Sequence, residues 1–329
     1  MNAVFTVSTP NYLGYSISLF NSLKKHNKEI DFYIILFRPT NNDFRSHIPK
    51  EINILYIDEL GLDKFVDNLV NRYPINKMCM AFKPIAATKI LELNSKIEKL
   101  IFFDSDILIF NSLKNIWDDL NTSNILLTPH LLKPLAKDKE NLELRMLSRA
   151  GVFNTGFFGV KRSEEAFGFL NWWFEQLLKF GLLGDQVWLN FAPTFFDVKA
   201  SRHQGNNVAF YNLPNRKITY NKSIEKYIVN DMDELIFFHY IKHNPFNNQN
   251  KISSARLMQK HLTFENHPEL IPIFEDFKDS LINANFSFYK QLKFSQQKQS
   301  YFVRKYVNFK HQFIRLCYKL IFDVVSLKK

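Results

Sequence analysis

The sequence is poor in cysteine, in glycine and in long apolar runs. Among its 329 residues are two cysteines and nine glycines, and no low-complexity stretch or internal repeat is present. Cys79 and Cys317 lie far apart and share no metal-ligand spacing, which argues against a disulfide framework and fits a reducing compartment. No apolar run approaches the roughly 20 residues of a membrane span. The N-terminal segment has no basic region before its short apolar run, so it predicts a first strand and not a signal peptide.

The composition otherwise indicates a folded globular chain with a basic C-terminal segment. A hydrophobic content of 46% suffices for one large domain or two small ones. Residues 286–329 contain ten Lys or Arg and one acid, which is +9 of the formal net charge of +11. The remaining body is therefore near neutral. A nucleic-acid-binding surface across that body is not supported, and we expect no nucleic-acid partner.

One apolar stretch, residues 100–110, contains two acidic residues two positions apart. Eight of its eleven side chains are large and apolar, and Asp104 and Asp106 interrupt them. In an extended chain such residues point to the same side. A buried like-charge pair is costly unless a cation lies between the carboxylates, and a divalent metal suits oxygen ligands. The alternative is a strand that ends at Asp104, with Asp106 as a turn or cap residue.

The elements before and around this stretch alternate between strand and helix patterns. Such alternation predicts an α/β fold with a mainly parallel sheet flanked by helices. Ligands in these sheets bind beyond the carboxyl ends of the strands, where the turn 8–12 and the two aspartates both fall. The expected strands are Ala3–Ser8, Asp31–Phe37, Ile52–Ile57 and Leu100–Phe110, and the expected helices are Leu13–Lys25, Leu60–Tyr73 and Met78–Leu93.

Polar residues in the middle of the chain are further candidates. Asn154 and Thr155 lie in the predicted strand Gly151–Val160, whose glycines indicate either a close approach of a ligand or backbone, or a tight bend. Asp185 and Gln186 follow the predicted helix Glu164–Phe180, at the start of another helix. There Asp185 has a structural alternative as an N-cap.

A histidine closes the last predicted strand, Asp233–Ile241. His239 is either a satisfied core residue or the third ligand of a metal site that includes the two aspartates. Lys242 would then face the anion that the metal binds. Beyond a polar loop at Phe246–Ser254, the sequence predicts covering helices at His267–Lys278 and Asp279–Leu292.

The C-terminal segment Tyr301–Leu327 has aromatic and apolar residues on one helical face and basic residues on the others. This pattern is typical of a helix in an anionic membrane interface. The alternative is a helix docked on the body or on a second subunit. We expect a catalytic domain at 1–250, a helical extension packed on it at 251–294, and a basic amphipathic tail at 295–329.

The ordered set of motifs resembles bacterial nucleotide-sugar glycosyltransferases of the GT-A fold, most closely family 8. The likeness spans residues 1 to about 290, with weak single motifs in a fairly specific order. The matching stretches are Thr6–Tyr12, Phe82–Pro84, Phe103–Ile107, Phe153–Gly156, Gly184–Asn190, His203–Ala209 and Phe238–Tyr240.

This resemblance implies roles for the matching residues. Asp104, Asp106 and His239 would bind Mn²⁺ or Mg²⁺, and Asp185 and Gln186 would lie beside the anomeric carbon. The residues expected to bind the donor, whether at nucleoside, sugar or phosphates, are Thr9, Asn11, Tyr12, Lys83, Asp104, Ser105, Asn154, Thr155 and Lys242.

Two positions depart from the family. Tyr240-Ile241-Lys242 replaces the small residue that often follows the histidine, and Lys83 replaces a common arginine. A lysine attracts phosphate as a point charge without the bidentate fork of arginine.

The implied reaction transfers a hexose-type sugar from a nucleotide-diphosphate donor, most simply a UDP-sugar. The acceptor would be a cell-surface glycan or a lipid-linked glycan, reached from the cytoplasmic face of the membrane, and retention of configuration follows from the resemblance alone. A metal neutralises the leaving diphosphate, and a mixed oxygen and nitrogen ligand set favours Mn²⁺ over Mg²⁺. A sugar-nucleotide nucleotidyltransferase would want a glycine-rich basic loop after the first strand, which residues 8–12 lack. A non-catalytic homologue is disfavoured because both aspartates are present.

Overall fold

A seven-stranded mixed sheet forms the centre of the molecule. The computed structural model describes residues 1–40, 44–62, 65–66, 69, 73, 75–134, 147, 150–180, 184–246, 251–252, 262–294, 309 and 313. The order of the strands is β3-β2-β1-β4-β7-β6-β8, and only β7 runs antiparallel to its neighbours. These strands are β1 (Asn2–Ser8), β2 (Asp31–Leu36), β3 (Ile52–Tyr56), β4 (Lys99–Phe103), β6 (Ile125–Pro129), β7 (Phe153–Lys161) and β8 (Val198–Ala200).

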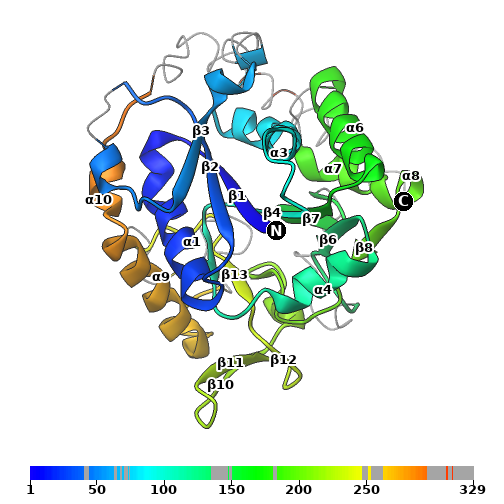
Figure 1. Ribbon diagram of the computed structural model, residues 1–329. Coiled ribbons are helices and arrows are strands. Elements are labelled where there is room, and N and C mark those ends of the chain that lie inside the picture. Colours follow the sequence, from blue (N-terminus) through cyan, green and yellow to red (C-terminus); the bar gives the residue numbers. More distant parts are fainter. Residues whose placement is uncertain are drawn as a thin grey trace.

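Helices cover both faces of this sheet (Figure 1). Successive side chains of β1 point to opposite faces. Accordingly Phe5 packs in one core with residues of α3 and α6, and Val4 packs in a second core with residues of α1 and α4. The α-helices are α1 (Leu13–His26), α3 (Ile75–Leu93), α4 (Lys114–Thr122), α6 (Glu164–Phe180), α7 (Asp185–Leu189), α8 (Ala192–Phe195), α9 (Ile271–Asn283) and α10 (Phe286–Tyr289).

Two small sheets and several 3₁₀ turns complete the described part. One sheet has the order β5-β13-β9 and contributes to the site, and the other, β10-β11-β12, projects from the body (Figure 1). Their strands are β5 (Ile107–Ile109), β9 (Val208–Ala209), β10 (Ile218–Asn221), β11 (Lys226–Val229), β12 (Asp233–Glu234) and β13 (Phe237–His239). The turns are η1 (Pro10–Tyr12), η2 (Arg45–His47), η3 (Ile57–Leu60), η4 (Leu213–Asn215) and η5 (Pro268–Leu270).

The expected α/β class with a mostly parallel sheet is confirmed, with corrections in two strands. The stretch 100–110 is not one strand, because it divides into β4 of the large sheet and β5 of a small sheet, with Asp104–Asp106 in the turn between them. The strand expected at 233–241 also divides, into β12 and β13. Continuous apolar runs cannot show that a chain changes sheets, because both halves are buried.

Two helix boundaries also differ from expectation. Helix α3 begins at Ile75, before the expected start at Met78, and contains Pro84 in its interior, because the packing of buried Ala81 and Ala86 outweighs the cost of one lost hydrogen bond. Helix α9 runs through 278–279 without a break and ends at Asn283, since Asn285 adopts a left-handed conformation (φ 53°) before α10.

Several expectations fall on the rest of the chain. Half of the helix expected at 60–73, most of the loop at 246–254 and nearly all of the tail at 301–327 lie outside the described residues. Phe309 and Phe313 of the tail are described, and both are helical and exposed. None of the helices in the described ranges has the length and hydropathy that a bilayer span requires.

Candidate active site

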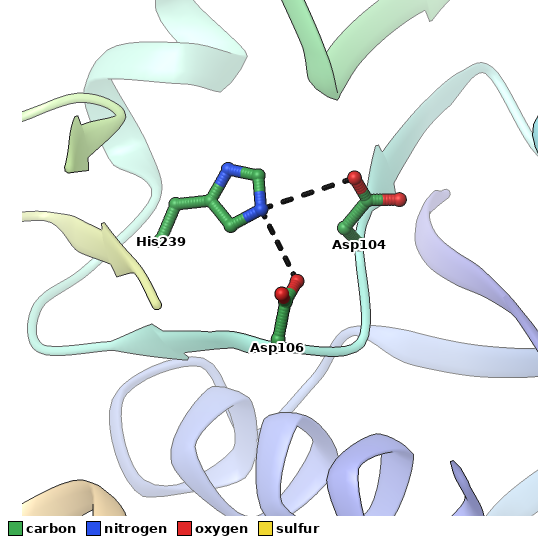
Figure 2. A group of neighbouring side chains, drawn as sticks. All are labelled: Asp104, Asp106 and His239. Atoms are coloured by element: carbon green, nitrogen blue, oxygen red, sulfur yellow. Dashed lines mark ion pairs between the residues drawn. The ribbon is translucent and has the colours of Figure 1, made fainter. Parts of the chain in front are cut away.

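Three predicted ligands meet at the carboxyl end of β4. Asp104 and Asp106 occupy the turn after β4, and His239 is the last residue of β13, which pairs with β5 so that His239 lies opposite Ile107. His239 Nε2 lies 3.1 Å from Asp106 Oδ1 and 3.9 Å from Asp104 Oδ2 (Figure 2). Strand pairing thus brings together side chains that are more than 130 positions apart.

The three ligand atoms fit a divalent metal. All lie within 4.8 Å of one another. Atoms that share one ion at bonds of about 2.1 Å lie roughly 3–4 Å apart, and the distances of 3.1 and 3.9 Å from His239 Nε2 to the two carboxylates fall in this range. The imidazole is buried, with a side-chain exposure of 2%, whereas the carboxylates of Asp104 and Asp106 are 31% and 28% exposed. The carboxylates therefore face a space that a ligand can enter.

Electrostatics within the cluster favour the charged forms of His239 and Asp106. Burial lowers the pKa of His239, but the carboxylates of Asp106 and Asp104 together outweigh it, and the net pKa is raised. Burial likewise raises the pKa of Asp106, and the neighbouring His239 reverses this, so that its pKa is lowered. For Asp104, burial and the charge of Asp106 prevail over Lys83 and His239, and its pKa is raised. A divalent cation would relieve the repulsion between the two carboxylates.

Gly156 makes room for the histidine. A Cβ at this position would lie 2.3 Å from His239 Cε1 and 2.6 Å from its Nδ1. The backbone of Gly156 also accepts a hydrogen bond from the N–H of Asp104 at 2.8 Å. The close approach expected from the glycines of this strand is therefore that of a side chain of the site itself.

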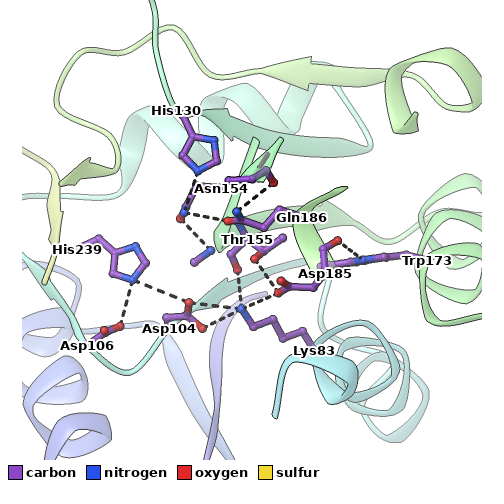
Figure 3. Close-up of polar contacts among 12 residues, drawn as sticks. Lys83, Asp104, Asp106, His130, Asn154, Thr155, Trp173, Asp185, Gln186 and His239 are labelled. Atoms are coloured by element: carbon purple, nitrogen blue, oxygen red, sulfur yellow. Dashed lines mark hydrogen bonds and ion pairs between the residues drawn. The ribbon is translucent and has the colours of Figure 1, made fainter. Parts of the chain in front are cut away.

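Lys83 is buried between two carboxylates. Its Nζ lies 3.0 Å from Asp104 Oδ1 and 3.3 Å from Asp185 Oδ2, and it donates to the Thr155 carbonyl at 3.0 Å (Figure 3). Burial lowers the pKa of Lys83, but the two aspartates outweigh it and the net pKa is raised. Lys83 is therefore charged and engaged with protein groups. It links α3 to the turn at 104–106 and to α7.

Asp185 is not the N-cap that we considered. Gly184 occupies the cap position, and Asp185 is the first residue of α7. Its side chain has no exposed surface, and Asp185 Oδ2 accepts a hydrogen bond from Thr155 Oγ1 at 2.7 Å. Trp173 Nε1 donates a hydrogen bond to the backbone carbonyl of Asp185 at 3.1 Å. Asp185 Oδ1 has no hydrogen-bond partner among the described residues. The structure thus places Asp185 behind Lys83 and Thr155.

Gln186 lies on the open side of the same helix turn. Its Oε1 accepts hydrogen bonds from Asn154 Nδ2 at 3.1 Å and from the Thr155 N–H at 3.2 Å. Its Nε2 donates to the Ala150 carbonyl at 3.2 Å, which leaves one N–H of the amide for another acceptor. Gln186 is half-buried, whereas Asn154, Thr155 and Asp185 are buried.

Asn154 and Thr155 are both buried within this network (Figure 3). Asn154 Oδ1 accepts from the Gly156 N–H at 2.9 Å, and its Nδ2 faces Gln186 and, at 3.4 Å, His130 Nε2. The resemblance implied a direct sugar contact for both side chains. Their side-chain hydrogen bonds go to Asp185, Gln186, His130 and the strand itself.

His130 is a site residue that the sequence did not indicate. It follows strand β6, is 3% exposed, and its Nδ1 lies 3.1 Å from the Val152 carbonyl. Burial lowers its pKa to about 4 although hydrogen bonds to the backbone oppose this, so the ring is neutral. With Nδ1 donating, Nε2 accepts from Asn154. A single histidine after an apolar strand gives no sequence signal that separates this role from a core position.

The remaining donor candidates surround the metal turn. Thr9 Oγ1 bonds Asn11 Oδ1 at 2.7 Å, and the Tyr12 ring, 43% exposed, stacks on Tyr15 with centroids 5.2 Å apart. Burial and the charge of Asp106 raise the pKa of Tyr12, as expected for a phenol close to the metal cluster.

Ser105 lies between the two aspartates, and Lys242 lies after β13 with an exposed side chain and a positive φ of 58°. Tyr240, the departure from the family, is a core residue. Its ring stacks on Phe277 at 3.9 Å, and its hydroxyl donates to the Ile273 carbonyl at 2.7 Å.

Comparisons with known proteins agree with this fold. Residues 3–164 match the sequence model of glycosyl transferase family 8. Two relatives from Bacillus subtilis (strain 168), the uncharacterized proteins YfnF and YfnD, are 22% and 23% identical over 249 and 246 residues. The matches cover 73% and 71% of this chain, and 80% and 76% of the relatives.

A solved structure extends the likeness beyond the family match. The galactosyltransferase LgtC, in complex with donor and acceptor sugar analogues, superposes with a TM-score of 0.50 at 16% identity, covering 86% of this chain and 96% of LgtC. At this identity the likeness concerns the fold, and it extends the GT-A architecture over most of the chain. These findings support a family 8-like glycosyltransferase with the GT-A fold.

Proposed function

We propose that this glycosyltransferase moves a hexose-type sugar from a nucleotide-diphosphate donor, preferably a UDP-sugar, to a cell-surface or lipid-linked glycan, with retention of configuration. The observation that carries the proposal is the cluster of Asp104, Asp106 and His239 at the carboxyl end of β4. This is the edge at which open α/β sheets bind nucleotides. LgtC, which shares the fold, was solved with donor and acceptor sugar analogues.

The cluster would hold Mn²⁺ or, less favourably, Mg²⁺. When bound, the metal supplies positive charge for the diphosphate that leaves the sugar. Asp104 and Asp106 offer oxygen ligands and His239 a nitrogen ligand, a mixture that favours Mn²⁺. Lys83 holds Asp104 in place through its 3.0 Å contact and is not free to grip a phosphate alone. Lys242, exposed beyond β13, is the better placed cation for that purpose.

Gln186 is the group that we assign to the reacting sugar. The anomeric carbon becomes cationic in the transition state, and the oxygen end of an amide dipole beside it lowers the barrier. Gln186 is half-buried and carries such an oxygen, Oε1, whereas the side chain of Asp185 has no exposed surface. Asp185, Asn154 and Thr155 therefore act by orienting Gln186 and Lys83. Thr9, Asn11, Tyr12 and Ser105 would contact the nucleoside and the phosphates.

The acceptor is expected at a membrane because of the basic end of the chain. We propose that a catalytic domain (1–250) and a helical extension (251–294) carry a tail (295–329) that binds the cytoplasmic face of an anionic membrane. The exposed, helical Phe309 and Phe313 support an apolar face on this tail. Liposome co-sedimentation of the full chain and of a chain ending at residue 294 tests it. Equal pelleting of both, or no preference for anionic lipid, would leave the tail as a packing or dimerisation helix.

A donor-hydrolysis screen tests the catalytic proposal. Purified protein is incubated with UDP-, GDP-, ADP- and CMP-sugars in Mn²⁺ and in excess chelator, and release of the nucleotide is measured. Metal-dependent hydrolysis of a UDP-hexose supports the proposal. Hydrolysis of a sugar attached to another nucleotide would show that the donor is not a UDP-sugar. Synthesis of a sugar nucleotide from a sugar phosphate would instead indicate a nucleotidyltransferase, and inactivity with every donor a non-catalytic homologue.

A further inference from the structure

A second large groove lies away from the metal site. Its volume is about 870 Å³, and its walls come from α1, β5, the hairpin β10–β11 and α9. Strand β5 connects the two places, because it starts directly after Asp106 and its other end, at Leu108–Phe110, lines the groove. A three-residue strand rises about 10 Å, so the groove is near the active site but separate from it. None of its lining residues is a donor, metal or catalytic candidate.

An aromatic platform forms one wall of the groove. Tyr220 is 51% exposed, and its ring packs edge-on against Tyr227 with centroids 5.1 Å apart. Tyr227 in turn packs at 90° on Phe110, with centroids 5.7 Å apart. The exposed ring therefore rests on a fixed support, and a ligand stacking on it loses little side-chain entropy. In Figure 1 this hairpin lies at the bottom of the molecule, next to one end of α9.

Polar side chains line the same groove. Asn21 of α1 and Asn283 and Asp276 of α9 line the groove, and their side chains make no hydrogen bond or ion pair with any described residue. Amides donate and accept, and carboxylates accept through two oxygens. An aromatic face beside planar amides and carboxylates suits a sugar ring, which has apolar C–H faces and hydroxyls around its edge.

The charged residues that line the groove restrict the class of ligand that it can bind. Four acidic residues and two lysines line the groove, and one of the lysines, Lys226, is already paired with Glu234 at 2.8 Å. The excess of negative charge disfavours phosphate, a nucleotide or an acidic polymer. A neutral glycan is compatible with it. A basic peptide is the competing ligand.

We infer that this groove binds a neutral oligosaccharide, namely the part of a glycan acceptor that lies away from the reacting end. The inference rests on the proposed function, because it makes the acceptor a glycan several sugars long. A volume of this size holds more than one sugar unit and falls within the range of small-molecule sites, about 300–1,000 Å³. Binding here would hold the acceptor on the protein while its other end is presented to the metal site.

The test is direct binding without turnover. Saturation-transfer NMR and calorimetry are run on the full chain with maltohexaose, laminarihexaose, chitohexaose and mannohexaose, with hexalysine as the competing probe. We expect at least one hexasaccharide to bind. Tyr220→Ala should weaken that binding about tenfold, and Tyr220→Phe, which keeps the ring, should change it less than about threefold. Asp276→Asn, which keeps a hydrogen-bond acceptor, should also have little effect.

The opposite results would overturn the inference. These are no binding of any hexasaccharide, binding that Tyr220→Ala leaves unchanged, or binding of hexalysine alone that Asp276→Asn removes. Donor hydrolysis is measured on the same variants and should equal that of the unmodified chain. If neither the unmodified chain nor any variant hydrolyses the donor while the hexasaccharide binds, the proposed function is wrong and the inference that the groove binds an oligosaccharide is retained. Failure of the proposed function and failure of the inference are therefore distinguishable.

Discussion

Gly156 lies against the ring of His239 so closely that no side chain fits between them: a Cβ on the glycine would stand 2.3 Å from His239 Cε1. The strand β7 therefore lies against the imidazole of the candidate ligand His239 and sets its position. The ring is almost wholly buried, and it cannot move toward solvent without leaving both aspartates. The glycine is therefore part of the site although it offers no functional group.

The first prediction concerns this contact. Gly156→Ala should displace His239 and weaken Mn²⁺ binding about 10- to 100-fold, a typical cost of disturbing the support of a metal ligand. Calorimetric titration with Mn²⁺ measures the change. Gly159→Ala is the matched control, because its Cβ would meet the mobile end of Leu120 at 3.0 Å instead of a ligand. Equal affinities in the two variants would contradict the proposed role of Gly156.

The second prediction concerns the buried charges. Lys83→Met should reduce the free energy of unfolding by about 3–5 kcal/mol, because it leaves the wholly buried carboxylate of Asp185 without its cation. Urea denaturation measures this. Adding Asp185→Asn to Lys83→Met should restore more than half of the loss. If the single variant costs less than about 1 kcal/mol, the pair is not the structural link that we describe.

The third prediction separates Gln186 from its neighbours. Gln186→Ala should lower kcat about 100-fold, because the amide is assigned to the cationic transition state, with less than about threefold change in the KM of the donor. Steady-state kinetics of donor hydrolysis provide both constants. Val187→Ala, at an exposed position of the same helix, should behave like the unmodified chain. A change confined to thermal stability would make Gln186 a structural residue.

The fourth prediction concerns pH and His130. Its native pKa of about 4 lies below the unfolded value of about 6.5, so the unfolded chain takes up the proton first as pH falls. The stability contributed by the neutral ring is present above pH ~6.5 and is lost as pH falls toward pH ~4, by up to about 3 kcal/mol.

Replacing this histidine shows its share of the pH dependence. His130→Gln should flatten the decline in unfolding free energy between pH 6.5 and pH 4, as followed by urea denaturation at several pH values. An unchanged slope would mean that other groups cause the decline.

The sequence predicted the local parts of this fold well. Apolar periodicity placed helix α6 at Glu164–Phe180, and strands β1 and β2 to within one residue. The sequence also indicated Asp104, Asp106 and His239 as candidate ligands, because an acidic pair after an apolar strand and a histidine closing another are uncommon in a buried setting. These features depend on residues that are neighbours in the chain.

The support of the site could not be predicted in the same way. The contacts of Lys83 with Asp104 and Asp185, and of His130 with Asn154, join separate elements, and no local pattern encodes them. The turn at 104–106 was only the alternative interpretation of this stretch, because both flanking segments are equally apolar. Helix α3 continues through Pro84 because tertiary packing overrides the local preference of proline.

The central claim is that Asp104, Asp106 and His239 hold the metal on which sugar transfer depends. The most direct measurement is hydrolysis of the preferred nucleotide sugar by the unmodified chain and by Asp106→Asn, each with Mn²⁺ and with excess chelator. Asp118→Asn, at a carboxylate whose side chain is 52% exposed, is the matched control. We predict activity of the unmodified chain and of Asp118→Asn that disappears in chelator, and a loss of more than about 100-fold in Asp106→Asn with an unchanged circular dichroism spectrum. Full activity in chelator, or in Asp106→Asn, would contradict the claim.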